Sequence, residues 1–139
     1  MDNILNIGTD RSSNLLEICK TRNYDVFVAD SLNLPFRTGL FDSVISIAVI
    51  HHFSTVELRI KAIREILRIL KIGGTCLLYV WAMEQEEKKF TEQDNFVPWH
   101  LQNTYENDIT IKSLGPEIMK DETKNSTVYH RYYHVFKKG

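Results

Sequence analysis

The stretch that decides the fold is Phe41-Asp42-Ser43-Val44-Ile45-Ser46-Ile47-Ala48-Val49-Ile50-His51-His52-Phe53. Its centre, from Val44 to Ile50, is almost entirely apolar and rich in β-branched residues, and it lacks the polar alternation of a half-buried strand. This pattern indicates a strand that is buried on both faces, as in a parallel sheet covered by helices. Two histidines follow at once, so the strand delivers polar groups to its carboxyl end, where ligands bind in open α/β sheets.

Shorter apolar runs on either side predict three further strands, at residues 4–8, 26–29 and 75–82. Helices are expected at about 12–22 and from the capping box Ser54-Thr55-Val56-Glu57 to about Leu70, before Gly73-Gly74. Residues 128–136 alternate in polarity, which predicts an antiparallel strand at a sheet edge. The order of these elements predicts an α/β fold with a doubly wound, mostly parallel sheet.

The composition fits one globular domain over residues 1–139, with 43% hydrophobic residues and a formal net charge of -1. This charge excludes a generally polycationic nucleic-acid binder, so any RNA contact must come from a local patch or a partner. Residues 100–127 are polar and poorly periodic, and we expect a flexible insertion there. The two cysteines, Cys19 and Cys76, lie in apolar contexts and predict buried, reduced thiols in a cytosolic or nuclear protein. Neither a signal peptide nor a membrane span is expected.

Two acids and two histidines are the candidate site residues that spacing alone supplies. Asp10 and Asp30 each follow a predicted strand, where a carboxylate can accept hydrogen bonds from a ribose diol. Each acid would serve equally well as a helix cap or a turn residue. His51 and His52 would point to opposite sides if the strand geometry continued, so that one faces a ligand and the other packs. We find no metal-ligand spacing, no nucleophile elbow and no phosphate-binding glycine loop.

Three motifs resemble class I methyltransferases, which have a Rossmann-like fold and use S-adenosylmethionine. They are Asp30-Ser31-Leu32-Asn33-Leu34-Pro35-Phe36, Phe41-Asp42 before the apolar strand, and Leu70-Lys71-Ile72-Gly73-Gly74. The stretches from Ile45 to Ser54 and from Tyr79 to Gln85 are similar to the tRNA wobble-uridine carboxymethyl methyltransferases. That family includes the yeast tRNA methyltransferase nine type and the methyltransferase domain of the eighth AlkB homologue. The resemblance covers about residues 5–100 and 128–139.

The resemblance implies methyl transfer from S-adenosylmethionine to the carboxylate of 5-carboxymethyluridine at the tRNA wobble position, which gives a methyl ester. The nucleophile is already ionised near neutral pH, so alignment and exclusion of water would be the main tasks of the enzyme. The implied partners are tRNA and a small zinc-binding activator subunit docked on the sheet edge, in the cytoplasm and also in the nucleus.

The resemblance also implies roles for individual residues. Asp10 would hold the ribose hydroxyls of the cofactor, and Asp30 would reach the adenine amino group with Ser31 and Leu32 beside it. The methionine end would lie against Ala48 and Ile50. His51 would be the catalytic residue on the substrate side, with His52 and Trp81 binding substrate.

One departure from the family pattern concerns the first residues of the chain. The family begins with a strand that ends in an acid-Gly-x-Gly-x-Gly motif, whereas Gly8-Thr9-Asp10 aligns with the second strand, which carries the ribose acid. We therefore expect an N-terminally truncated sheet that leaves two apolar strands with unpaired edges and binds S-adenosylmethionine weakly or not at all. Two alternatives stay open: a regulatory or partner-binding protein without catalysis, and a methyltransferase for a small molecule.

Overall fold

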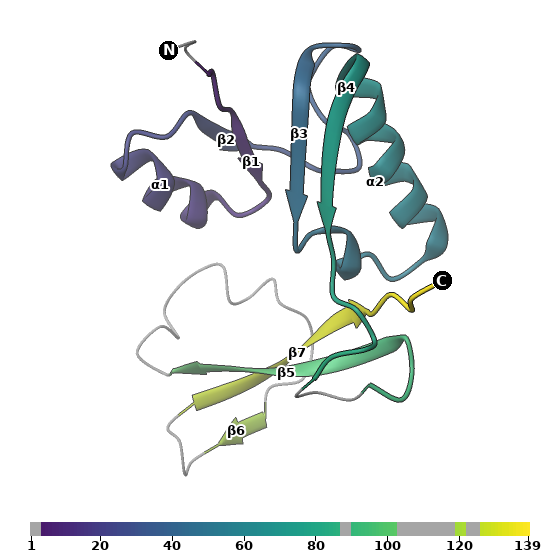
Figure 1. Cartoon of the computed structure of the whole chain (residues 1–139). Helices are drawn as coiled ribbons and strands as arrows, with labels where there is room; N and C mark the ends of the chain where they lie inside the picture. The colour runs from purple at the N-terminus through teal and green to yellow at the C-terminus, as the bar shows by residue number, and fades with distance from the viewer. Residues whose placement is uncertain (1–3, 87–89, 103–118, 122–125) are drawn as a thin grey trace.

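The computed structural model describes residues 4–86, 90–102, 119–121 and 126–139 (Figure 1). The first half of the chain holds two short strands around a helix, then a longer strand, a 3-10 turn, a second helix and a fourth strand. These elements are β1 (Gly8–Asp10), α1 (Ser13–Thr21), β2 (Val26–Val28), β3 (Phe41–Ile47), η1 (Ile50–His52), α2 (Val56–Ile69) and β4 (Leu70–Tyr79). The second half holds β5 (Asp94–Gln102), β6 (Met119–Asp121) and β7 (Ser126–His134).

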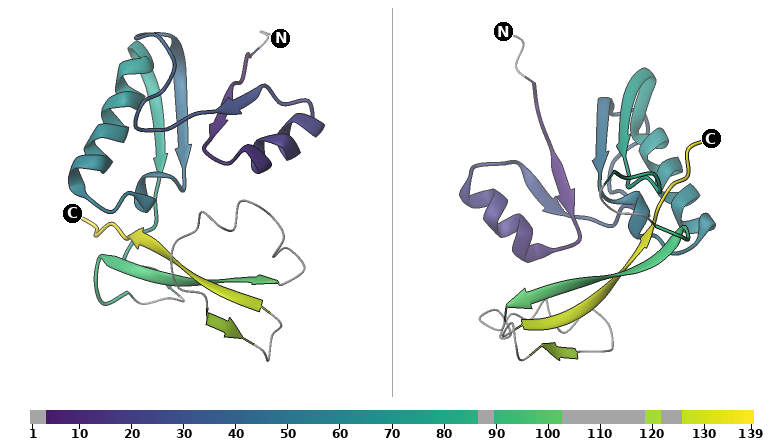
Figure 2. Two further views of the ribbon diagram at one scale, coloured as in Figure 1. Left: turned by 180° about the vertical axis from the view of Figure 1, so that it is seen from behind. Right: turned by 60° about the horizontal axis from the view of Figure 1, so that its bottom comes forward.

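The strands form three separately bonded sheets in the described part of the chain. β1 pairs with β2 and β3 pairs with β4, both in parallel, whereas β5, β7 and β6 form an antiparallel sheet in that order. The β1–β2 pair lies beside β3 without bonding to it (Figures 1 and 2). The predicted α/β class, the parallel strands and the antiparallel pairing of the C-terminal strand are therefore confirmed. The prediction that this strand lies at a sheet edge is wrong, because β7 pairs with β5 on one side and with β6 on the other. The predicted single sheet is instead divided into the pairs β1–β2 and β3–β4 and the antiparallel sheet β5–β7–β6.

The strand β3 is half-buried on one face and exposed on the other. Val44 packs against the core cluster of Ile50, Ala62 and Ile66 beneath α2, while the alternate residues Ile45 and Ile47 are 67% and 57% exposed. The prediction that this strand is buried on both faces is wrong. Its apolar composition is typical of a strand that is covered on both faces. Among the described elements, however, it bonds to β4 alone, and α2 packs on one face.

The boundaries of α2 differ slightly from the sequence prediction. Thr55, not Ser54, caps the helix, and its hydroxyl accepts a hydrogen bond from the Leu58 amide at 3.3 Å. The helix ends at Ile69, four residues before Gly73, so the two glycines lie within β4. A Cβ on Gly74 would come within 2.9 Å of the backbone oxygens of Asp42 and Lys71. This close approach, beside the register shift between β3 and β4, requires a glycine.

Three other expectations concern the second half of the chain and the cysteines. The stretch 100–127, predicted as an insertion, begins within β5, contains β6 and ends in β7, and its other residues lie outside the described part. Both cysteines are free thiols, but Cys76 is exposed, so the prediction that it is buried is wrong. Neither helix of the described chain has the length and apolar character needed to cross a membrane.

Candidate active site

Four rings meet at the carboxyl ends of β3 and β4, and we call them the aromatic cluster: His51, His52, Trp81 and Tyr133. The His51 and His52 rings meet edge to face with centroids 4.5 Å apart, and Trp81 stacks on Tyr133 at 4.3 Å and 14°. Tyr133 also lies 5.1 Å from His51 and 4.5 Å from His52. The chain leaves the strand after Ile47 and forms a 3-10 turn, so the two histidine rings touch and do not point to opposite sides.

The turn into this cluster passes through a backbone conformation that is unusual for a side-chain-bearing residue. Ala48 has φ 59°, in the left-handed region, and its amide donates to the Tyr79 carbonyl oxygen at 2.9 Å. Such a conformation costs about 1 kcal/mol for a residue other than glycine. The surrounding hydrogen bonds maintain this turn, which brings Ile50 into the core and His51 into the aromatic cluster.

His51 is the most enclosed member of the cluster, with 1% of its surface exposed. Its Nδ1 accepts a hydrogen bond from the Trp81 backbone amide at 3.2 Å, so in the neutral ring the proton lies on Nε2. Burial, with a smaller contribution from the neighbouring His52, lowers the pKa of His51 from 6.5 to about 4. His51 is therefore a neutral imidazole at physiological pH and can donate a hydrogen bond from Nε2.

His52 is exposed and is oriented by β7. Its Nδ1 lies 3.1 Å from the backbone carbonyl oxygen of Tyr132, which can only accept, so in the neutral ring Nδ1 carries the proton and Nε2 is an acceptor. The structure thus brings together three residues that the resemblance assigns to the substrate side, namely His51, His52 and Trp81. Sequence reasoning missed Tyr133. The one signal that could have found it was its position in the alternating strand 128–136, which is half-buried.

The two acids lie at the ends of the adjacent strands β1 and β2, Asp10 as the last residue of β1 and Asp30 two residues after β2. The Ala29 amide donates to the Asp10 carbonyl oxygen at 3.0 Å, which joins the ends of β1 and β2. One carboxylate oxygen of Asp10 accepts from the Ser12 amide at 2.7 Å, and one of Asp30 accepts from the Leu32 amide at 2.9 Å. Both acids thus have the local turn role that spacing allowed. Because both are exposed, this role does not prevent them from binding a ligand.

Arg68 and Glu65 on α2 hold the loop that follows Asp30. Arg68 donates to the carbonyl oxygens of Phe36 and Leu34 at 2.7 and 2.9 Å, and Glu65 accepts from the Leu34 amide at 2.9 Å. The hydrogen bonds from Arg68 hold the pKa of Glu65 below its usual value. Leu32 packs against the core beneath α2. The loop with Asp30, Ser31 and Leu32 is therefore fixed to the same helix that supports the aromatic cluster.

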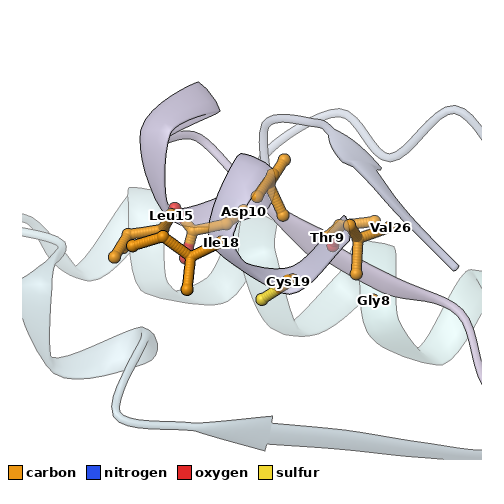
Figure 3. A pocket seen from close by; sticks show the side chains of 8 residues that line it. Gly8, Thr9, Asp10, Leu15, Ile18, Cys19 and Val26 are labelled. Carbon is orange, nitrogen blue, oxygen red and sulfur yellow. The ribbon is translucent and has the colours of Figure 1, made fainter. Parts of the chain in front are cut away.

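A hollow of about 340 Å³ lies between β1 and α1 (Figure 3). Its lining is mainly apolar, and Asp10 is its one charged residue; the complete lining is Gly8, Thr9, Asp10, Leu15, Leu16, Ile18, Cys19 and Val26. The aromatic cluster contributes nothing to it. The described residues therefore place two groups of candidate site residues on two separate parallel strand pairs.

A family model described as a methyltransferase domain matches residues 5–78, more than half of the chain. The chain belongs to the methyltransferase domain family. Its fold is also that of a solved SAM-dependent methyltransferase from Thermotoga maritima, with a TM-score of 0.52 at 19% identity, over 93% of this chain and 68% of that one.

Three relatives are tRNA (carboxymethyluridine(34)-5-O)-methyltransferases. The alkbh8 protein of Xenopus tropicalis is 41% identical over 96% of this chain and 27% of its own length. The Schizosaccharomyces pombe enzyme is 39% identical over 99% of this chain and 60% of its own, and the Saccharomyces cerevisiae enzyme is 44% identical over 85% and 44%. The methyltransferase domain thus spans about a quarter to three fifths of the length of these relatives.

A methyltransferase domain implies S-adenosylmethionine as the methyl donor, and the described residues fit it in part. Asp10 and Asp30 are exposed acceptors at the ends of adjacent strands, which suits the ribose hydroxyls and the amino group of an adenosine. The other half of the cofactor would have to lie between β1 and Ala48. No described strand bonds between β1 and β3, so the described strands do not complete this part of the binding surface. We find no described group of His, Cys, Asp or Glu that could hold a metal ion.

Proposed function

We propose that this methyltransferase domain transfers a methyl group from S-adenosylmethionine to the carboxylate of 5-carboxymethyluridine at position 34 of tRNA. The observation that carries this proposal is the identity of 39–44% with enzymes named for that reaction, over 85–99% of the chain. The aromatic cluster at the ends of β3 and β4 supports it, because stacked rings beside a neutral donor suit a nucleobase.

In this proposal the domain performs positioning rather than acid–base chemistry. The carboxylate of the substrate is ionised at pH 7 and needs no base to make it nucleophilic. The bound cofactor supplies an electrophilic methyl group on a sulfonium sulfur. Neutral His51 donates from Nε2 to the substrate, His52 and Trp81 bind the modified base, and Asp10 and Asp30 bind the adenosine. Because His51 adds no positive charge, it does not repel the sulfonium.

The proposed partners are tRNA and a small zinc-binding activator subunit. The net charge of -1 supports a partner that contributes to RNA binding, because the domain as a whole does not attract a polyanion. A compartment that contains tRNA, the cytoplasm or the nucleus, follows from the same proposal.

A second candidate is a binding role without catalysis, and the separation of the two parallel strand pairs favours it. A cofactor held at its adenosine end alone would not have its methyl group fixed against the nucleophile. A small-molecule acceptor has less support, because the relatives that cover most of the chain are named for tRNA.

Mass spectrometry of tRNA nucleosides distinguishes these candidates. We expect the chain, incubated with the activator, S-adenosylmethionine and tRNA that carries 5-carboxymethyluridine, to produce the methyl ester. A His51→Asn variant should produce less, since it loses the Nε2 donor. tRNA binding without any methyl ester above background would contradict the catalytic proposal and favour the binding role.

The affinity for the adenosine part of the cofactor tests the role of Asp10. We expect Asp10→Asn to weaken binding of S-adenosylhomocysteine about tenfold in calorimetry, because a charge-assisted hydrogen bond to the ribose is lost. The amide oxygen can still accept from the Ser12 amide, so the local turn is kept. Asp25→Asn, a matched change just before β2, should have no effect. Equal affinities for both variants would mean that Asp10 does not contact the ribose.

A further inference from the structure

Tyr132 connects β7 to the segment that carries both histidines. Its hydroxyl lies within hydrogen-bonding distance of two acceptors, the Ser54 carbonyl oxygen at 3.1 Å and the Asp94 carboxylate. Its own carbonyl oxygen accepts from His52 at 3.1 Å. One residue of β7 therefore contacts the segment 50–54 through its side chain and through its backbone.

Asp94 fixes the position of the Tyr132 hydroxyl. The antiparallel register places Asp94 opposite His134, whose Nδ1 donates to the same carboxylate oxygen at 2.8 Å. Hydrogen bonds from Tyr132 and then His134 hold the pKa of Asp94 below its usual value, so it is a carboxylate at neutral pH. Burial and the neighbouring carboxylate raise the pKa of Tyr132, so its hydroxyl keeps its proton and remains a donor.

Arg59 on α2 also binds the segment 50–54. Its side chain is 9% exposed and donates to the Phe53 carbonyl oxygen at 2.8 Å. Its charge also lowers the pKa of Asp94. The backbone oxygens of two consecutive residues, Phe53 and Ser54, are thus bound by Arg59 and Tyr132, while the preceding His52 ring is bound by the Tyr132 carbonyl.

We propose that Tyr132, Asp94, His134 and Arg59, the Tyr132 network, are positioning residues that hold His52 in the tautomer opposite to that of His51. Trp81 fixes the proton of His51 on Nε2, and Tyr132 fixes that of His52 on Nδ1. The pair then offers one donor and one acceptor at the two Nε2 atoms. The network acts through the segment 50–54, which it contacts at His52, Phe53 and Ser54. Its importance for methyl transfer rests on the function proposed above, but its effect on the tautomers does not.

Nitrogen-15 NMR of the histidine rings tests the network directly at pH 7. In the unaltered chain we expect His51 as the Nε2–H tautomer and His52 as the Nδ1–H tautomer. Tyr132→Phe keeps the ring and the backbone carbonyl but removes the hydroxyl contacts with Ser54 and Asp94. We expect His52 to populate both tautomers in this variant, and the amides of residues 50–54 to exchange hydrogen about tenfold faster.

Two further variants keep the test decisive. Asp94→Asn preserves size and should shift the His52 signals in the same direction, even if Tyr132→Phe fails to fold. Tyr79→Phe removes the hydroxyl of a tyrosine that is 60% exposed on β4 and should change neither reading. Unchanged tautomers and exchange rates in folded Tyr132→Phe and Asp94→Asn would overturn the proposal. Shifted tautomers in a chain that forms no methyl ester would instead uphold the network and contradict the proposed function.

Discussion

Lowering the pH from 6.5 to 4 is expected to remove about 3 kcal/mol of the free energy of unfolding through His51 alone. Well above pH 6.5 the ring is neutral in both the folded and the unfolded chain, so there His51 adds no pH dependence to the free energy of unfolding. Below 6.5 the unfolded chain takes up the proton first, because the folded pKa is about 4. Stability therefore falls through this window, and the loss is complete once both states are protonated.

Denaturant unfolding at a series of pH values measures this loss. His51→Asn removes the titrating group and leaves an oxygen that can accept from the Trp81 amide, so its stability should depend on pH less steeply than that of the unaltered chain. His100→Asn, the same change at an exposed position of β5, should leave the original slope. Parallel curves for His51→Asn and the unaltered chain would show that His51 is not held neutral by burial.

The elements around β3 could be predicted from sequence because their signals are local. A short apolar run of β-branched residues, a capping motif and a glycine pair gave β3, α2 and β4 to within a few residues. The burial of Ile45 and Ile47 could not be predicted in the same way. Apolar side chains show that a strand is suited to a core, but burial also depends on what packs against the second face, and that is not encoded in the strand itself.

The candidate site shows the same limit at longer range. His51 was identified because it directly follows the apolar run from Val44 to Ile50. Tyr133, Tyr132 and Asp94 were not, because their contacts join positions far apart in the chain, such as His52 and Tyr132 at a separation of 80 residues or Asp94 and Tyr132 at 38. β5 was missed altogether, since Pro98 and several polar residues interrupt its pattern and it is defined by pairing with β7.

These long-range contacts explain how a divided sheet can still hold a defined site. The segment 50–54 is supported from below by the core beneath α2 and from the side by β7. Neither support requires β1 or β2. Asp10 therefore lies on a strand pair that does not bond to β3, whereas the loop that carries Asp30 and Leu32 is joined to the core beneath α2.

Truncation of Ile66 to alanine should have the second large effect, a loss of about 3 kcal/mol in the free energy of unfolding. Ile66 is 5% exposed and packs with Ile50 and Ala62, so the shorter side chain leaves a cavity under η1. A loss of this size is a large share of the 5–15 kcal/mol that is usual for a domain. Because Ile50 directly precedes His51, the cavity should also loosen the aromatic cluster, and the pKa of His51 should rise towards 6.5.

The neighbouring position supplies the matched control. Leu67→Ala removes a similar volume from a side chain that is 59% exposed, and we expect it to cost no more than about 0.5 kcal/mol. Denaturant unfolding gives both energies, and NMR titration of the histidines gives the pKa of His51 in each variant. Equal losses at the two positions would mean that Ile50, Ala62 and Ile66 do not form the core that supports the site. A large loss from Ile66→Ala with an unmoved His51 pKa would mean that β7 and Trp81 hold the ring without help from that core.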